Sequence, residues 1–242
     1  MPDSEKRLQK RLEVGAIVFP GIDQMDLTGP FEVLSMLPNS AFYLVWKEIA
    51  PVRDMKGLIL TPDTTLAGAP ALDLLLVPGG WGQEALMDDE EALGFIRTQA
   101  AGARYTMSVC TGALICGAAG LLRGVKATTH WSVHHLLKYF GAIPVNARVV
   151  IDGKHVSTAG VSAGIDGALR AASLLADERT AQAIQLAMEY APEPPFKSGT
   201  PETAPADVVE AVRASFRQMT GARLATAQQI ASRLGIGPVE RD

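Results

Sequence analysis

Cysteine is scarce in this chain, and long apolar runs are absent. Only two cysteines, Cys110 and Cys116, occur among 242 residues, and both lie in one apolar stretch. This number and spacing exclude a secreted disulfide framework and do not match a set of zinc ligands. We therefore expect a protein of the reducing cytoplasm.

Membrane and targeting signals are also missing. No run approaches the roughly 18 apolar residues of a membrane span. The segment MPDSEKRLQKRLEV is charged and lacks the apolar core of a signal peptide. Positive charge is in deficit, because 22 Lys and Arg stand against 26 Asp and Glu, a net charge of −4. Nucleic acid is therefore disfavoured as a partner, and no membrane association is expected.

The chain does contain apolar runs that alternate with helical patterns, and its 48% hydrophobic residues suffice for a globular core. The predicted strands are LEVGAIVF (12–19), AFYLVWKEI (41–49), DLLLVPGG (73–80), ARYTMSV (103–109), a short strand near 126–128, RVVIDG (148–153) and KHVSTA (154–159). Helices are expected after most of them, including one from about Trp131 and two over roughly 161–175 and 178–190. The pattern predicts an α/β fold, a three-layer sandwich with a mostly parallel sheet and helices on both faces.

The first helix is expected to begin at Gly29-Pro30. Gly29 would cap it, Pro30 would occupy its first position, and Glu32 would lie near the positive end of its dipole. Asp26 would then lie on the loop that leaves the first strand. Asp23, on the same loop, is interpreted as a solvated aspartate.

The predicted organisation is a catalytic domain over 12–190, a strap over 191–205 that holds five prolines, and a helical extension over 206–242. Within the extension, RLATAQQIASRLGIG resembles the first helix and turn of a helix-turn-helix. Too few residues follow it for a recognition helix, and five Arg balance five acidic residues over 201–242. A DNA-binding regulator is therefore a disfavoured alternative.

Cys110 stands where an apolar strand gives way to a helix, in RYTMSVCTGALICG. A helix N-terminus favours thiolate, so a lowered pKa of Cys110 is expected, and a sharp turn would expose the thiol as in a nucleophile elbow. The alternative is that Cys110 is a small buried hydrophobe. Cys116, farther along the same helix, is expected to serve packing.

Ligands of doubly wound sheets bind beyond the carboxyl ends of the strands, where Asp26, the Gly79-Gly80 turn and Cys110 all lie. Asp26 is expected to act as general acid or base, with its pKa raised by burial and by the neighbouring thiolate. The amides of the glycine turn and of Thr111 are expected to form an oxyanion-type hole. The hydroxyl of Thr111 is expected to hydrogen-bond the thiolate or Asp26.

A metal site is not expected. His130 and His134 have the spacing of a metal-binding pair on a helix, but no third ligand is evident. His130 remains the alternative acid or base should Asp26 not fill that role.

Taken in order, the segments DLTGPFEVL, LLLVPGGWG, SVCTGALICGAAGLL, ATTHW and AGVSAGIDGAL resemble the ThiJ/PfpI superfamily of class I glutamine-amidotransferase-like proteins, most closely its isonitrile hydratase branch. The resemblance spans roughly residues 12–205. It implies a flavodoxin-like fold, a homodimer, and neither a metal nor an organic cofactor. It also implies that Cys110 is the nucleophile, Asp26 the catalytic carboxylate and Thr111 the hydroxyl residue beside them.

Other branches of this superfamily carry a His directly after the cysteine and a Glu on the first loop, and this chain has neither. The expected reaction is addition of water to a small-molecule isonitrile through a covalent Cys110 thioimidate, giving an N-substituted formamide. Trp81 follows the glycine pair where a smaller residue is expected, so we predict that it shapes the substrate pocket with Gly79 and Gly80. Another cysteine-dependent enzyme of the superfamily and a redox sensor that uses Cys110 are the alternatives.

Overall fold

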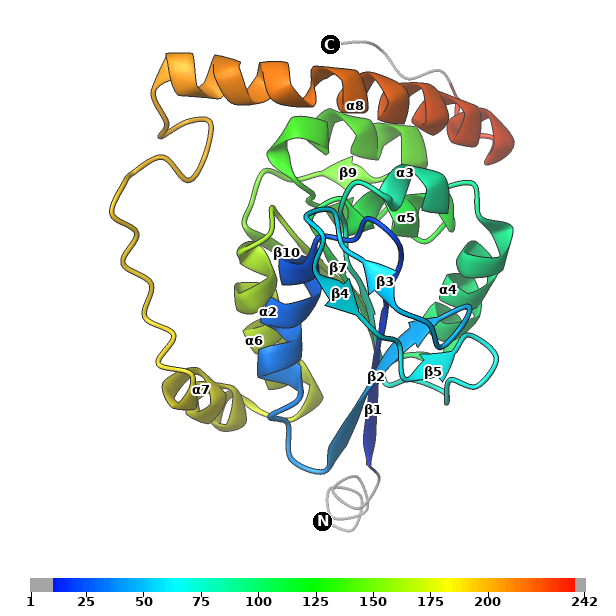
Figure 1. The fold of residues 1–242 in the computed structure, drawn as a ribbon, viewed down its shortest axis with the longest axis vertical. Coiled ribbons are helices and arrows are strands. Elements are labelled where there is room, and N and C mark those ends of the chain that lie inside the picture. Colours follow the sequence, from blue (N-terminus) through cyan, green and yellow to red (C-terminus); the bar gives the residue numbers. More distant parts are fainter. Residues whose placement is uncertain (1–10, 238–242) are drawn as a thin grey trace.

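The computed structural model describes residues 11–237, which fold around one large sheet (Figure 1). Its strands are β1 (Leu12–Ile17), β2 (Ser40–Trp46), β5 (Thr64–Thr65), β6 (Leu74–Val77), β7 (Tyr105–Val109), β10 (Val149–Asp152) and β11 (His155–Thr158). The seven strands lie in the order β10-β11-β7-β6-β1-β2-β5. Neighbours run parallel except β10 and β11, which pair antiparallel.

Helices cover both faces of this sheet (Figure 1). One face carries α2 (Gln24–Leu34), α6 (Ala163–Leu175) and α7 (Glu178–Ala187), and the other carries α4 (Glu90–Gly102) and α5 (Gly112–Ala118). Smaller elements are α3 (Gln83–Leu86), the 3-10 helix η1 (Trp131–Phe140), and the paired strands β3 (Val52–Arg53) with β4 (Ile59–Leu60) and β8 (Lys126–Ala127) with β9 (Ile143–Pro144). The predicted flavodoxin-like sandwich with a mostly parallel sheet is confirmed.

The central strands are apolar throughout because both of their faces are covered. All four residues of β6, LLLV, are fully buried, and so are Val14, Ala16 and Ile17 of β1. In a one-sided sheet every second position would be polar. The uninterrupted apolar runs of the sequence therefore correspond to the middle of the sheet.

The predicted start of the first helix is wrong. Helix α2 begins at Gln24, because Asp23 caps it by accepting a hydrogen bond from the Met25 amide at 3.1 Å. Asp23 is accordingly buried rather than solvated, and Pro30 lies inside the helix. Gly29 instead permits close packing against α6, since a Cβ on it would lie 3.0 Å from Cγ1 of Ile165.

The C-terminal part is a single long helix, α8 (Ala206–Arg233), which lies across η1 and reaches α3 (Figure 1). Its buried residues are Arg223, Ala227, Ile230 and Ala231, a stripe at helical spacing. The proline-rich segment 191–205 is exposed almost throughout and carries the chain from α7 to α8. The division into domain, strap and extension stays a prediction, and positions 238–242 of the extension lie outside the described residues.

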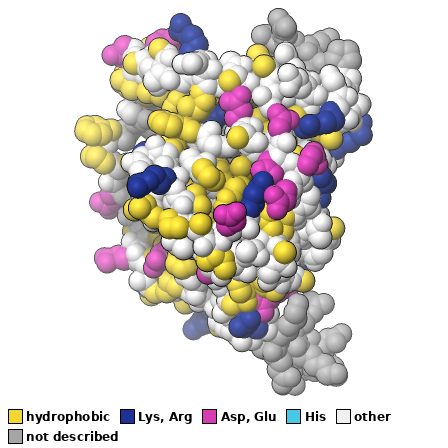
Figure 2. All heavy atoms as spheres, turned by 45° about the vertical axis from the view of Figure 1, so that its right-hand side comes forward, with side chains coloured by type: hydrophobic (Ala, Val, Ile, Leu, Met, Phe, Trp, Pro, Cys, Tyr) yellow, Lys and Arg dark blue, Asp and Glu magenta, His cyan; other side chains and the backbone are white. Residues whose placement is uncertain are grey.

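Within residues 11–237, no helix is both long and apolar enough to cross a membrane. Acidic and basic side chains are interspersed on the face shown in Figure 2, with hydrophobic side chains between them. That face is therefore not the uniformly positive kind of surface that binds phosphate groups.

Candidate active site

Cys110 forms a strained elbow between β7 and α5. Its φ of 55° is left-handed, a region that non-glycine residues rarely occupy. The Cys110 amide donates to the Ala159 carbonyl at 2.9 Å, and the Thr129 hydroxyl donates to the Cys110 carbonyl at 2.6 Å. Helix α5 starts very close to β6, because a Cβ on Gly112 would lie 2.0 Å from the Val77 carbonyl oxygen. The elbow expected at this junction is present.

Asp26 lies in the first turn of α2, not on a loop, and is completely buried. Its Oδ2 accepts a hydrogen bond from the Gly79 amide at 2.9 Å. Its Oδ1 has no nitrogen or oxygen partner within the described part of the chain. Burial and then the nearby Asp23 raise the pKa of Asp26 to about 8, while hydrogen bonds from Gly79 and Cys110 oppose the rise. The carboxyl group therefore keeps its proton at neutral pH.

The expected lowering of the Cys110 pKa is wrong. Burial, and then the Asp26 carboxyl, raise the pKa of this thiol well above its usual value. Hydrogen bonds from the backbone amides of Val161 and Thr111 act in the opposite direction and are outweighed. The side chain is 7% exposed, so the helix N-terminus acts on a thiol that has little water to stabilise its charge.

The amides of the Gly79-Gly80 turn already have protein acceptors. Gly79 donates to Asp26, and Gly80 donates to Oγ1 of Thr111 at 3.1 Å. The oxyanion role expected for them is therefore not what they perform in this structure. The amides that reach Cys110 belong to Thr111 and Val161.

The Thr111 hydroxyl contacts the Gly80 backbone instead of the thiol or Asp26. It accepts from the Gly80 amide and also lies 3.4 Å from the Gly80 carbonyl oxygen. The expected bond to a charged partner is thus replaced by a bond to the turn. Trp81, which follows the turn, is 53% exposed and lies at the surface rather than among the buried groups of the site.

His130 has a structural role at the start of η1. His130 caps η1, and its Nδ1 accepts from the Ser132 amide at 3.3 Å. Burial, and then the charge of Arg223, lower the pKa of His130 to about 4, so the ring is neutral. Among residues 11–237 no group of three His, Cys, Asp or Glu side chains could hold a metal ion.

The sequence alone did not predict that Val161 and Arg223 belong to the site. Val161 has a φ of 25° and supplies an amide to Cys110. Arg223 of α8 donates from Nη2 to the Gly80 carbonyl at 2.9 Å and is only 4% exposed. Val161 lies in a segment with several glycines, which is typical of a turn. Arg223 lies in a largely polar helix, where nothing in the neighbouring sequence indicates that an arginine is buried.

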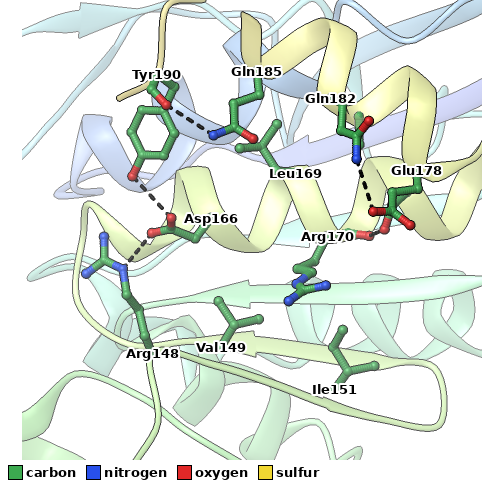
Figure 3. A pocket seen from close by; sticks show the side chains of 12 residues that line it. Arg148, Val149, Ile151, Asp166, Leu169, Arg170, Glu178, Gln182, Gln185 and Tyr190 are labelled. Carbon is green, nitrogen blue, oxygen red and sulfur yellow. Dashed lines mark hydrogen bonds and ion pairs between the residues drawn. The ribbon is translucent and has the colours of Figure 1, made fainter. Parts of the chain in front are cut away.

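A surface groove of about 740 Å³ lies elsewhere, between β10 and helices α6 and α7 (Figure 3). Asp166 is one of the residues that line it, and this side chain is bound to Arg148 at 2.5 Å and to the Tyr190 hydroxyl at 3.2 Å. None of the predicted site residues lines this groove. The chemistry of Cys110 and Asp26 is therefore separate from it.

A cysteine on a strained elbow, at the carboxyl edge of a parallel sheet and beside a buried carboxyl group, defines a class of α/β proteins that carry a cysteine between a central strand and the following helix. The chain belongs to the DJ-1/PfpI family, whose sequence pattern matches residues 13–173. It is 50% identical to an isonitrile hydratase of Pseudomonas putida over 225 residues, 93% of this chain and 99% of that protein.

Solved structures agree with this placement. A ThiJ/PfpI family protein from Pseudomonas syringae superposes with a TM-score of 0.88 and 41% identity, covering 94% of this chain and 95% of that one. Drosophila melanogaster DJ-1beta superposes with a TM-score of 0.69 and 21% identity over 76% of this chain and 100% of its own. The second likeness shows the shared fold alone.

Proposed function

We propose that this chain is an isonitrile hydratase that converts an isonitrile into an N-substituted formamide through a covalent bond to Cys110. The observation that carries the proposal is the pairing of a buried thiol with a carboxyl group that keeps its proton at neutral pH. An isonitrile has no leaving group, so its terminal carbon needs one nucleophile and one proton. The likeness to the Pseudomonas putida enzyme over nearly the full length supports the same chemistry.

In the first step the sulfur of Cys110 attacks the terminal carbon while that carbon receives a proton. Asp26 gives its proton to the carbon and takes up the proton that leaves sulfur, so its carboxyl group ends unchanged. A C–S and a C–H bond form, and the S–H bond breaks, which leaves a thioimidate. Oδ1 of Asp26 suits this exchange, because it has no other partner among the described residues.

In the second step water adds to the thioimidate carbon. A proton of the water passes to nitrogen, directly or through Asp26, and the resulting tetrahedral adduct holds sulfur, hydroxyl and amine on one carbon. Cleavage of the C–S bond returns the hydroxyl proton to sulfur and releases the formamide. The amides of Thr111 and Val161 already reach the sulfur and would stabilise it as it leaves.

A redox-sensing role fits less well. Susceptibility to oxidation follows thiolate character and exposure. The thiol of Cys110 has a raised pKa and is nearly buried. Turnover of a substrate that brings its own electrophilic carbon suits such a thiol better than spontaneous reaction with peroxide.

The test is incubation of the protein with an aryl isonitrile in D₂O, followed by absorbance and NMR. We expect formamide with deuterium on the formyl carbon, because the proton that reaches carbon comes from exchangeable groups. Cys110→Ala should abolish turnover. Cys116→Ala is the matched control and should keep most of it, because Cys116 is buried in α5 and its pKa is raised to about 12. Equal losses in the two variants, or no formamide from the wild-type protein, would contradict the proposal.

We further propose a cytoplasmic homodimer. Both cysteines are free thiols, as a reducing compartment would keep them. Leu58 and Ile59 on the β3–β4 hairpin are each 51% exposed, and the nearby Trp81 is 53% exposed. The hairpin adjoins the turn that precedes α2, since the Gly21 amide donates to the Arg53 carbonyl at 2.9 Å. This apolar surface suits a second copy, and Ile59→Lys should yield a monomer by light scattering.

A further inference from the structure

Arg223 reaches the site from a helix far away in the sequence. It lies 143 positions beyond Gly80, yet its Nη2 donates to the Gly80 carbonyl at 2.9 Å. Helix α8 brings it there by lying across η1 and reaching α3 (Figure 1). The side chain is 4% exposed, so the guanidinium is enclosed between α8 and the glycine turn.

The charge of Arg223 is not neutralised by an ion pair with any described carboxylate. Its Nε is buried without a hydrogen-bond partner in the same part of the chain. Burying a cation in this way is unfavourable unless other groups compensate for the lost hydration. Burial lowers the pKa of Arg223, and the interactions with Cys110 and then with Glu84 of α3 oppose that effect.

The Gly80 carbonyl held by Arg223 belongs to the turn that organises the reacting groups. The amide of Gly79 in this turn holds Oδ2 of Asp26, and the amide of Gly80 holds the Thr111 hydroxyl. Gly80 has a φ of 130°, a conformation that favours glycine, so this turn is built on a backbone geometry that other residues rarely adopt. Arg223 is therefore connected to Asp26 and Thr111 through one short stretch of backbone.

We infer that Arg223 is a positioning residue of the reaction: it fixes the Gly79-Gly80 turn that holds Asp26, and its positive charge stabilises the sulfur of Cys110 as negative charge develops there. The expected effect of Arg223 on catalysis rests on the proposed function. The electrostatic effect of Arg223 on the thiol can be measured without an isonitrile. Through Arg223, helix α8 becomes a part of the active site.

The charged groups that act on the thiol are few. Asp26 and Asp23, both from the start of α2, raise the pKa of Cys110. From α8, the electrostatic interaction of Arg223 with Cys110 favours the charged guanidinium. On the far side, Arg223 itself interacts with Glu84 and with the neutral His130. Removing the charge at position 223 therefore leaves the two carboxyl groups opposed only by the amides of Val161 and Thr111 among the groups that act on the thiol.

The experiment measures the rate of Cys110 alkylation by iodoacetamide from about pH 7 to pH 12, and separately kcat and KM for an aryl isonitrile near neutral pH. In Arg223→Gln we expect the midpoint of the alkylation profile to rise by about one pH unit and kcat to fall roughly tenfold or more, with a smaller change in KM. Arg223→Lys keeps the charge and should keep the wild-type midpoint. It should still lower kcat, because lysine cannot reproduce the planar donor geometry at Gly80.

Arg233→Gln is the matched control. Arg233 also fastens α8 to the body of the protein, through the Met87 carbonyl at 3.3 Å and Asp88 at 3.2 Å, but it lies outside the site. It should leave both the alkylation midpoint and kcat unchanged. If it shifts the midpoint as Arg223→Gln does, the effect comes from loosening α8 and the inference is wrong.

Two further outcomes separate this inference from the proposed function. A wild-type midpoint in folded Arg223→Gln would overturn the electrostatic role whatever the enzyme does with isonitriles. Should Arg223→Gln not fold, Arg223→Lys decides: a wild-type midpoint with lowered kcat supports the inference, and unchanged kcat overturns it. A wild-type protein that does not hydrate isonitriles contradicts the proposed function, while a raised midpoint in Arg223→Gln still supports the action of Arg223 on the thiol.

Discussion

The amide of Gly79 donates to Oδ2 of Asp26 at 2.9 Å, although the two residues lie 53 positions apart in the chain. This hydrogen bond joins the first turn of α2 to the turn that follows β6. It occupies one carboxyl oxygen and leaves Oδ1 without a nitrogen or oxygen partner among the described residues. The position of the carboxyl group is thus set by backbone, and its protonation by burial.

Replacing Asp26 with Asn should lower kcat/KM for an isonitrile by about 100-fold or more, the usual scale for losing a general acid or base. The amide keeps the size of the side chain and removes proton exchange. Because the pKa of Asp26 is raised to about 8, the wild-type kcat/KM should fall as the pH rises through about 8. A pH profile of both proteins tests this, and a wild-type rate that is flat to pH 9 would move the acid elsewhere.

The same substitution should stabilise the protein at alkaline pH. The folded-state pKa of Asp26, about 8, lies above the ordinary value of 3.8 for an aspartate, so the folded protein holds a proton that the unfolded chain lacks. Wild-type stability is therefore lost as the pH rises through about 8, and the loss between roughly pH 6.5 and 8.5 should be about 2 kcal/mol. Urea unfolding of both proteins at the two pH values measures it. Parallel curves would show that Asp26 is ionised throughout.

Thr111→Val should lower stability by about 1–3 kcal/mol, because it leaves the buried Gly80 amide without its acceptor. The midpoint of Cys110 alkylation should stay in place, since the hydroxyl contacts the turn and not the thiol. Thr111→Ser should restore the stability. An alkylation midpoint that moves in Thr111→Val would instead indicate a direct bond between the hydroxyl and the sulfur.

Gly79→Ala should reduce activity strongly and lower stability by about 1–3 kcal/mol. A Cβ at this position would lie 2.5 Å from Oγ1 of Thr111 and 2.9 Å from Oδ2 of Asp26, so the turn and the carboxyl group would be forced apart. Gly94→Ala on α4 is the control, because its nearest neighbour, the Arg97 side chain, would lie 3.9 Å away. The control should be neutral or slightly stabilising in thermal unfolding. Equal behaviour of the two variants would mean that the turn is more adaptable than its contacts indicate.

The local sequence pattern predicted the wrong start for helix α2, because two different signals for a helix N-terminus occur close together. Gly29-Pro30 has the form of a helix start, but Asp23 offers a side-chain cap six residues earlier, and capping decided the boundary. The glycine and proline instead contact α6, a partner that local sequence does not reveal: a Cβ on Gly164 would lie 3.1 Å from Cγ of Pro30. A boundary predicted from one motif therefore depends on how the rest of the chain packs.

By itself the sequence determined the parallel sheet, the elbow at Cys110 and the meeting of that elbow with Asp26 and the glycine turn. These follow from short-range patterns, since apolar runs set the strands and parallel strands place their carboxyl ends at one edge. Only the tertiary structure decided the proton affinities of Cys110 and Asp26, the use of the Gly79 and Gly80 amides, and the arrival of Arg223. Burial by the surrounding elements sets the proton affinities of Cys110 and Asp26. The hydrogen bonds of the Gly79 and Gly80 amides and of Arg223 join segments that are distant in the chain, and no local pattern encodes such contacts.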